Sequence, residues 1–360
     1  MNIPEFVIAG PDSIVASIPH IIGFTPQDSL VVMWLRDGCV RLTMRIDLPT
    51  AQESPIPVVD AVMGHRAPGD GVILCIMSSP GESVSKSVGD LRSSGLMSML
   101  LTRLGETDSK VRDALHASGD RWWSYLCDEH ECCPPAGTPI DRDVAEGVAA
   151  RFAFVGAAHF PDRQAVIALC AADPIRQQAN RPRVRRARLA RSARIADARD
   201  STVELELWRD ESIVRVRDLL LGPCEIDLAI EIESLVALCD VRVRDTVLWE
   251  VANSTEHDAH RAFDRAAALL RGAPVGVIAP IGSVTALLAW LIGDGVRAGA
   301  ALDRVTVENP DYALADLLHI SISAGLPPAG WIHMMRGLAR ESCRGGLTRA
   351  YSLTRPPGPR

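Results

Sequence analysis

Leu30-Val31-Val32-Met33-Trp34-Leu35 is an unbroken apolar run, and it decides how the first part of the chain folds. After the turn Arg36-Asp37-Gly38, apolar residues occupy every second position: Val40, Leu42, Met44 and Ile46. An unbroken run is typical of a strand buried on both faces, and alternation is typical of a strand with one exposed face. We therefore predict a β-hairpin whose first strand lies inside a sheet.

The segments around this hairpin complete an α/β pattern. Upstream, Ser13 can cap a short helix that Pro19 is expected to end. Downstream, Val72–Met77 is another buried strand, and the spacing over Ser83–Leu104 predicts a helix. A second hairpin is expected from Val111–Ala117 and Arg121–Cys127. Strand, helix and strand in this order predict a mixed sheet with flanking helices.

Beyond Pro134-Pro135 the apolar spacing is helical. We predict an α/β region followed by an all-helical C-terminal region. The expected parts are an α/β domain (1–165), a helical connecting region (166–270), a compact helical domain (271–350) and a flexible tail (351–360). Within the third part, helices near Ser283–Ile292, Val296–Thr306 and Tyr312–Ala324 are predicted to include a tetratricopeptide-like pair, because small residues line one helix face.

Composition limits the class of protein. The chain has 360 residues, of which 47% are hydrophobic and 23% charged, which is an ordinary globular balance. The longest apolar stretch, Ile281–Ile292, is shorter than the ~20 residues that span a bilayer, and the start lacks a secretory signal. Nine cysteines without framework spacing indicate reduced thiols. We expect a cytoplasmic protein with no membrane partner.

Three stretches carry a resemblance to a known family. They are residues 17–32 (SIPHIIGFTPQDSLVV), residues 121–139 (RWWSYLC leading into CCPPAGTP), and residues 289–295 with 309–315 (AWLIGDG and NPDYALA). In this order and spacing the chain resembles the actinobacterial family catalogued as domain of unknown function 4192. The resemblance implies no reaction, ligand or partner. The chain departs from the family pattern at Asp128-Glu129-His130-Glu131, where a short acidic-proline stretch is usual.

The turn from Gly23 to Ser29 offers polar groups directly before the buried strand. A structural role is the first interpretation, because Asp28 can accept hydrogen bonds from nearby backbone amides. Alternatively, Asp28 and Ser29 with His20 would supply the base, nucleophile and orienting groups of a catalytic or ligand-binding site. Arg121 and Trp122 complete this candidate set: His20, Asp28, Ser29, Arg121 and Trp122.

A second candidate site contains Cys127, Cys132 and Cys133. A structural role, a redox role and a metal site are all compatible with three thiols in seven residues. Adjacent cysteines in an extended chain point apart, so we predict no metal at this cluster. Cys127 and Cys132 can form a disulfide if the loop folds back.

Arginines dominate residues 181–194, and a basic helix can bind nucleic acid. Acidic residues follow closely at Glu204, Glu206, Asp210 and Glu211, and the formal net charge of the chain is −7. We therefore expect an ion-paired, solvated helix and no nucleic-acid partner.

These patterns contain no complete catalytic or cofactor motif, and no cofactor is predicted. The first function hypothesis is a non-enzymatic binding or adaptor protein whose partner, a protein or a small molecule, is unassigned. The alternative is an enzyme using Asp28 and Ser29, or a redox-responsive protein using Cys127, Cys132 and Cys133.

Overall fold

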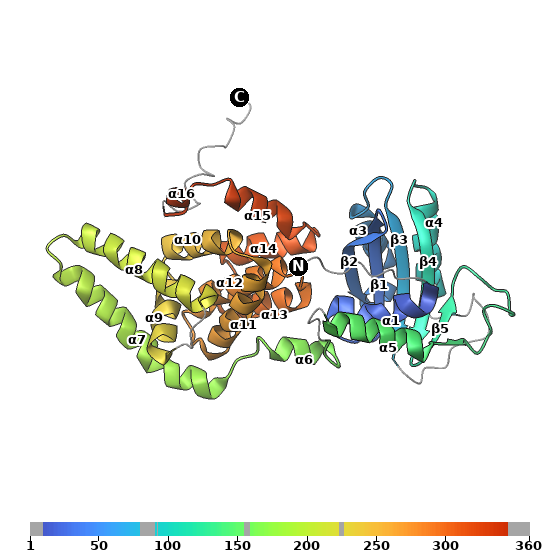
Figure 1. The fold of residues 1–360 in the computed structure, drawn as a ribbon, viewed down its shortest axis with the longest axis horizontal. Coiled ribbons are helices and arrows are strands. Elements are labelled where there is room, and N and C mark those ends of the chain that lie inside the picture. The colour runs from blue at the N-terminus through green and yellow to red at the C-terminus, as the bar shows by residue number, and fades with distance from the viewer. Residues whose placement is uncertain (1–9, 80–90, 92, 155–158, 223–226, 345–360) are drawn as a thin grey trace, which may run out of the picture. The chain divides into compact units, whose positions relative to one another are not determined.

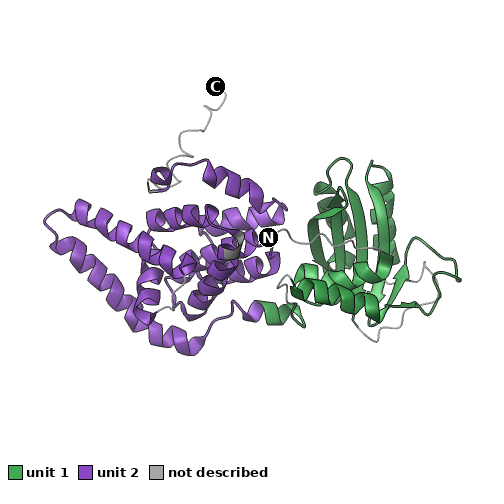
Figure 2. Cartoon of the chain, in the orientation of Figure 1, with its two compact units in different colours: residues 1–166 green, residues 167–360 purple. Residues whose placement is uncertain are grey.

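The computed structural model describes residues 10–79, 91, 93–154, 159–222 and 227–344. Contacts divide the chain into two compact units, residues 1–166 and 167–360 (Figure 2). The N-terminal unit holds a six-stranded mixed sheet, and the C-terminal unit is helical, as the sequence predicts (Figure 1).

The sheet of the N-terminal unit has the order β2-β1-β3-β4-β5-β6. Its strands are β1 (Ser29–Arg36), β2 (Cys39–Asp47), β3 (Gly71–Ser78), β4 (Lys110–Ser118), β5 (Arg121–Ser124) and β6 (Thr138–Pro139). Only the β3–β4 pair is parallel, and all the other neighbours are antiparallel. Both predicted hairpins are confirmed, and β1 is buried from Ser29 to Trp34.

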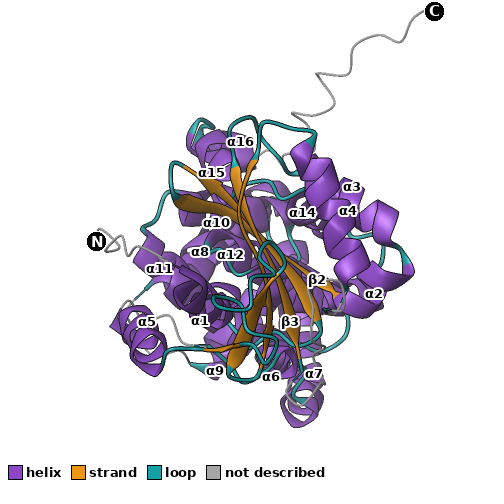
Figure 3. Ribbon diagram, turned by 90° about the vertical axis from the view of Figure 1, so that its right-hand side faces the viewer, coloured by secondary structure: helices purple, strands orange, loops and turns teal. Residues whose placement is uncertain are grey.

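Helices cover both faces of this sheet, as Figure 3 shows. The helices that pack on the sheet are α1 (Gly10–Ile22), α2 (Leu48–Glu53), α3 (Pro55–Gly64) and α4 (Ser94–Gly105). The helix α5 (Arg142–Phe154) packs on α1, and α6 (Arg163–Ala168) crosses the boundary between the two units. Side chains of β1 alternate between the faces: Leu30 and Val32 join the core formed with α2, α3 and α4. Val31 and Met33 join the core formed with α1. The period of two therefore divides one apolar strand between two cores.

Three boundaries differ from the sequence prediction. Pro19 lies inside α1, which continues to Ile22 and ends at Gly23, where φ is +88°. The expected start of the helix at Ser83 lies outside the described residues, and α4 begins at Ser94. The strand β5 ends at Ser124 rather than Cys127. The last difference matters because it leaves all three cysteines of the candidate site in a loop.

The C-terminal unit is built entirely from helices in its described residues. They are α7 (Pro174–Asp197), α8 (Ser201–Leu221), α9 (Leu228–Ala237), α10 (Val241–Ala252), α11 (Glu256–Gly272), α12 (Ile278–Leu291), α13 (Gly295–Glu308), α14 (Ala313–Ser323), α15 (Pro328–Arg336) and α16 (Arg340–Arg344). One buried cluster extends from Cys170 to Cys343, so the residues on either side of 270 share a core. None of the helices in the described ranges is long and apolar enough to cross a membrane.

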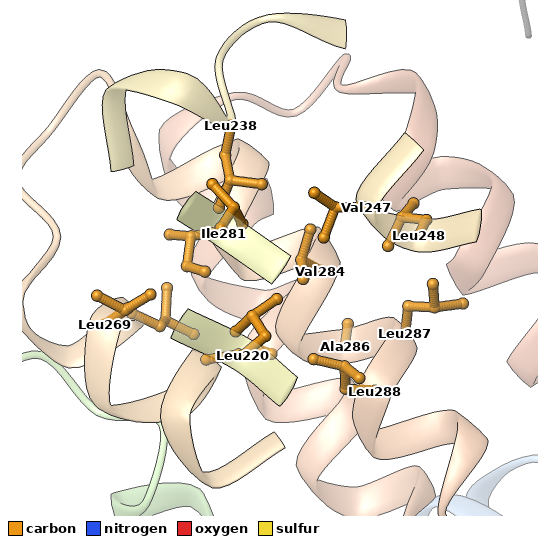
Figure 4. Packing of buried hydrophobic residues seen from close by; sticks show 14 of the residues in the cluster. Leu220, Leu238, Val247, Leu248, Leu269, Ile281, Val284, Ala286, Leu287 and Leu288 are labelled. Carbon is orange, nitrogen blue, oxygen red and sulfur yellow. The ribbon is translucent and has the colours of Figure 1, made fainter. Parts of the chain in front are cut away.

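The helix α12 lies at the centre of this core. It is buried from Ile278 to Trp290, and Ile281, Val284 and Leu288 pack among side chains of the surrounding helices (Figure 4). The helix α13 approaches it closely at Gly282, where an added Cβ would lie 2.4 Å from a methyl carbon of Val305. The small residue therefore permits the contact between the two helices.

Candidate functional site

The three cysteines of the second candidate site converge in the loop between β5 and β6. The Sγ atoms of Cys127, Cys132 and Cys133 all lie within 4.8 Å of one another. The Sγ atoms of Cys127 and Cys132 are 3.1 Å apart. In the part of the chain that the structure describes, this is the one group of three or more His, Cys, Asp or Glu side chains close enough to hold a metal ion.

A tight turn brings the adjacent cysteines together. The backbone N–H groups of Cys132 and Cys133 both donate to the carbonyl oxygen of Glu129, at 3.2 and 2.8 Å. The expectation that these two side chains point apart assumed an extended chain, and it is wrong because the chain turns here. His130 belongs to the same loop but is not among the converging groups.

Residues of β5 hold the second half of the loop. Arg121 donates from Nη1 to the carbonyl oxygens of Ala136 and Gly137, at 3.2 and 2.8 Å. The indole Nε1 of Trp123 donates to the carbonyl oxygen of Pro135 at 3.2 Å. These bonds fix the backbone that follows Cys133, so the thiol cluster sits on a braced loop.

Trp123 contacts this loop, whereas Trp122, a member of the first candidate set, lies on the other face of the sheet. Neighbouring residues of a strand point to opposite faces of the sheet. Trp122 accordingly joins the core beneath α1, and its Nε1 donates to Asp12 at 3.1 Å. The sequence carried both indoles side by side, and only the register of β5 distinguishes them.

Trp123 packs on a buried polar pair, His116 and Ser78, which was not predicted from the sequence. His116 of β4 is fully buried, and its Nε2 lies 2.9 Å from the hydroxyl oxygen of Ser78 at the end of β3. The ring of Trp123 stacks on the imidazole, with 5.3 Å between the ring centroids. A histidine within the short segment Ala114-Leu115-His116-Ala117, which is otherwise apolar, was the available signal.

The surroundings of the thiols shift their pKa values in different directions. Hydrogen bonding to Cys132 and to the backbone at Glu129 lowers the pKa of Cys127. Hydrogen bonding to Cys127, together with burial, raises the pKa of Cys132. Burial and the two neighbouring sulfurs raise the pKa of Cys133 to about 12. The three thiols therefore differ in their readiness to ionise.

Within the first candidate set, the described contacts of His20 and Ser29 are with residues outside the set. His20 stacks on Phe152, with centroids 4.8 Å apart, and meets His159 edge-on at 4.5 Å. Burial, with the nearby His159, lowers the pKa of His20. The hydroxyl of Ser29 donates to the carbonyl oxygen of Gln27 at 2.7 Å and accepts from Arg45 Nε at 3.0 Å. Among the described residues, the partners of the Ser29 hydroxyl are therefore Gln27 and Arg45 and not His20.

The family comparison agrees with the three motifs that suggested a resemblance. The model of the domain of unknown function 4192 matches residues 11–329. The chain belongs to this family. Searches of curated proteins and of solved structures find no match to the chain.

In this member of the domain of unknown function 4192 family, Asp28 joins the start of β1 to the end of β3. One carboxylate oxygen accepts from the hydroxyl of Ser79 at 2.9 Å, and the other lies 3.4 Å from the Ser79 backbone nitrogen. The φ of Asp28 is +44°, a conformation that aspartate and asparagine adopt more readily than most residues. The Asp28 carboxylate therefore has a defined partner in the fold, Ser79, as the structural interpretation requires.

Asp28→Asn is expected to lower the free energy of unfolding by about 1–2 kcal/mol, because a charge-assisted bond becomes a neutral one. Thermal unfolding of the unaltered chain and of the variant measures this loss of stability. Asp37→Asn is the matched control, since Asp37 also has a positive φ, of 52°, but is exposed in the hairpin turn. An unchanged or raised melting temperature for Asp28→Asn would assign Asp28 to a ligand-binding role instead.

The arginine-rich stretch of this family member forms α7, as predicted. Its C-terminal half is ion-paired: Arg194 contacts Glu204 and Glu211, and Arg191 contacts Asp240 at 3.4 Å. Hydrogen bonding to Arg194 lowers the pKa of Glu211. The N-terminal half of the arginine-rich stretch instead lines a shallow exposed groove. Its lining residues are Arg181, Pro182, Arg185, Arg186 and Leu189. The absence of a nucleic-acid partner stays a prediction.

Proposed function

We propose that the protein is a thiol-responsive binding protein, in which oxidation links Cys127 to Cys132. The distance of 3.1 Å between their Sγ atoms carries this proposal. A disulfide needs a separation of about 2.05 Å, so the sulfurs have to approach by roughly 1 Å. Both residues lie in a loop and Cys132 is exposed, so the approach disturbs no buried packing.

The chemistry requires a peroxide or a disulfide as oxidant. With a peroxide, one thiolate attacks an oxygen and becomes a sulfenic acid as the O–O bond breaks and hydroxide or an alkoxide leaves. The second thiol then attacks that sulfur, the S–O bond breaks, and water leaves as the disulfide forms. Two electrons pass from the thiols to the peroxide, and a dithiol reductant reverses the change.

Two features weigh against catalysis by the first candidate set. The Ser29 hydroxyl proton is committed to the carbonyl oxygen of Gln27, and the imidazole of His20 packs between Phe152 and His159. A reversible thiol pair also suits the reducing cytoplasm, which is the location that we propose. The adaptor role, its partner and the tetratricopeptide-like helix pair stay predictions.

Mild oxidation of the reduced full chain is expected to produce one disulfide between Cys127 and Cys132. Because exposed disulfides are more easily reduced than buried structural ones, its reduction potential should lie between roughly −180 and −300 mV. Peptide mass mapping after titration in glutathione buffers of defined potential measures both the linkage and the potential.

Two serine variants serve as controls for this titration. Cys132→Ser should abolish the linkage, whereas Cys239→Ser, at an exposed thiol in the C-terminal unit, should leave it unchanged. The proposal fails if Cys127 pairs with no residue, or if the potential lies below −300 mV as in a structural disulfide.

A further inference from the structure

The separations of the same three sulfurs are close to those of a tetrahedral thiolate site. A Zn–S bond of about 2.3 Å at the tetrahedral angle places neighbouring sulfurs about 3.8 Å apart. The Cys127 and Cys132 sulfurs are 3.1 Å apart, and no pair in the cluster exceeds 4.8 Å. Adjustments of about 1 Å or less therefore convert the cluster into three corners of a tetrahedron.

The fold of the loop already holds the three sulfurs within 4.8 Å of one another. The turn closed by the carbonyl oxygen of Glu129 places Cys132 and Cys133 together, and the bonds from Arg121 and Trp123 hold the following backbone. A ligand set that is already convergent loses less conformational entropy on binding than a flexible one.

The charges of the loop favour a cation. Asp128, Glu129 and Glu131 lie between the cysteines, and no lysine or arginine occurs from residue 126 to residue 139. Three carboxylates in an exposed loop produce a negative potential that attracts a positive ion. They supplement the sulfurs, which are the ligands that select a soft metal.

We propose that Cys127, Cys132 and Cys133 bind a thiophilic divalent cation, with zinc as the ion to test, and that water occupies the fourth position. Binding converts three thiols into thiolates and releases three protons, so a dipositive ion with three thiolates carries a net charge of −1. This inference builds on the proposed function, because oxidation of Cys127 and Cys132 removes two ligands and releases the ion.

Zinc titration of the reduced full chain tests this site. We expect one equivalent of zinc per chain to withstand competition from a chromogenic chelator at neutral pH, and the disulfide form to bind none. A phosphine keeps the thiols reduced, because dithiols themselves bind zinc. Failure of the reduced chain to retain zinc would overturn the metal site.

Cys133→Ser separates this inference from the proposed function. Cys133 is a ligand in the metal site but has no part in the Cys127–Cys132 disulfide. The variant should lose zinc affinity at least tenfold and still form the disulfide, while Cys239→Ser should bind zinc as the unaltered chain does. Equal zinc affinity in Cys133→Ser and the unaltered chain would refute the three-sulfur site. Zinc binding without disulfide formation would instead refute the redox function alone.

Discussion

Asp70→Ala is expected to lower the free energy of unfolding by about 3 kcal/mol. The carboxylate is fully buried and accepts from Arg36 of β1 at 2.6 and 2.9 Å and from Arg41 of β2 at 2.9 Å. It also accepts from the backbone N–H of Ala67 at 2.9 Å. Removing it takes the acceptor from Arg36 Nε and from the Ala67 N–H, while Arg41 Nη2 keeps its bond to the carbonyl oxygen of His65 and Arg36 Nη2 its bond to that of Pro68. The two guanidinium groups are partly exposed and can be rehydrated, which places the expected loss at the lower end for a broken buried pair.

Asp108→Ala is the matched control for Asp70. Asp108 likewise accepts from an arginine, Arg66, at 2.5 Å and from a backbone N–H, that of Gly69, at 2.9 Å. Its side chain is 56% exposed, whereas that of Asp70 is 0% exposed. Asp108→Ala should therefore lower the free energy of unfolding by at most about 1 kcal/mol. Urea denaturation of the full chain measures both losses, and equal losses would show that burial is not the cause.

The contribution of Asp70 should also depend on pH. Burial by itself raises the pKa of Asp70, but the hydrogen bonds from Arg36, Ala67 and Arg41 outweigh it and hold the pKa below its ordinary value. A carboxyl group with a lowered pKa stabilises the folded state above its unfolded pKa of about 3.9. The stabilisation is lost as the pH falls through the lower folded value. The difference in stability between the unaltered chain and Asp70→Asn should therefore shrink below about pH 4.

Local sequence signals predicted the hairpin because all of its determinants are local. Asp37 and Gly38 adopt positive φ values, of 52° and 82°, as a tight two-residue hairpin turn requires. The apolar run and the alternating run then fix which strand is internal. No distant contact is needed to decide this arrangement.

The predicted end of a helix was wrong where packing in the core overrides a local sequence preference. Pro19 lacks an N–H, yet α1 continues past it, and Ile21 and Ile22 beyond the proline pack against the same core as Ile18. The helix α8 lies inside the predicted helical connecting region, but no separate bounds were predicted for it. Exposed Val203 and Leu207 lie beside buried residues on the same helix, so no clean apolar stripe marks it.

The thiol cluster was recognised in the sequence, but its geometry depends on distant contacts. Whether Cys132 and Cys133 point together is decided by the turn at Glu129 and by the bonds from Arg121 and Trp123. The strand β5 presents Trp123 to the loop only because of its register with β4. Sequence spacing alone contains neither the turn nor the register.

Gly137→Ala is expected to lower the free energy of unfolding by about 3 kcal/mol and to weaken both reactions of the thiol cluster. A Cβ at this position would lie 2.5 Å from two ring carbons of Trp123, and the φ of +77° disfavours any side chain. The backbone strain costs about 1 kcal/mol, and displacing a packed ring adds roughly 1–3 kcal/mol. Moving the ring or the loop changes the backbone after Cys133, so zinc binding should weaken with it.

Gly119→Ala separates strain from steric contact, because Gly119 has a φ of +60° in the neighbouring hairpin and no atom within 4 Å of an added Cβ. It should cost only about 1 kcal/mol and leave zinc affinity unchanged. Combining Gly137→Ala with Trp123→Leu removes the ring that the methyl group meets. The double variant should therefore be less destabilised than the sum of the single variants. Additive losses in urea denaturation would mean that Gly137 does not act through Trp123, and the role of the Trp123 ring in bracing the thiol loop would have to be abandoned.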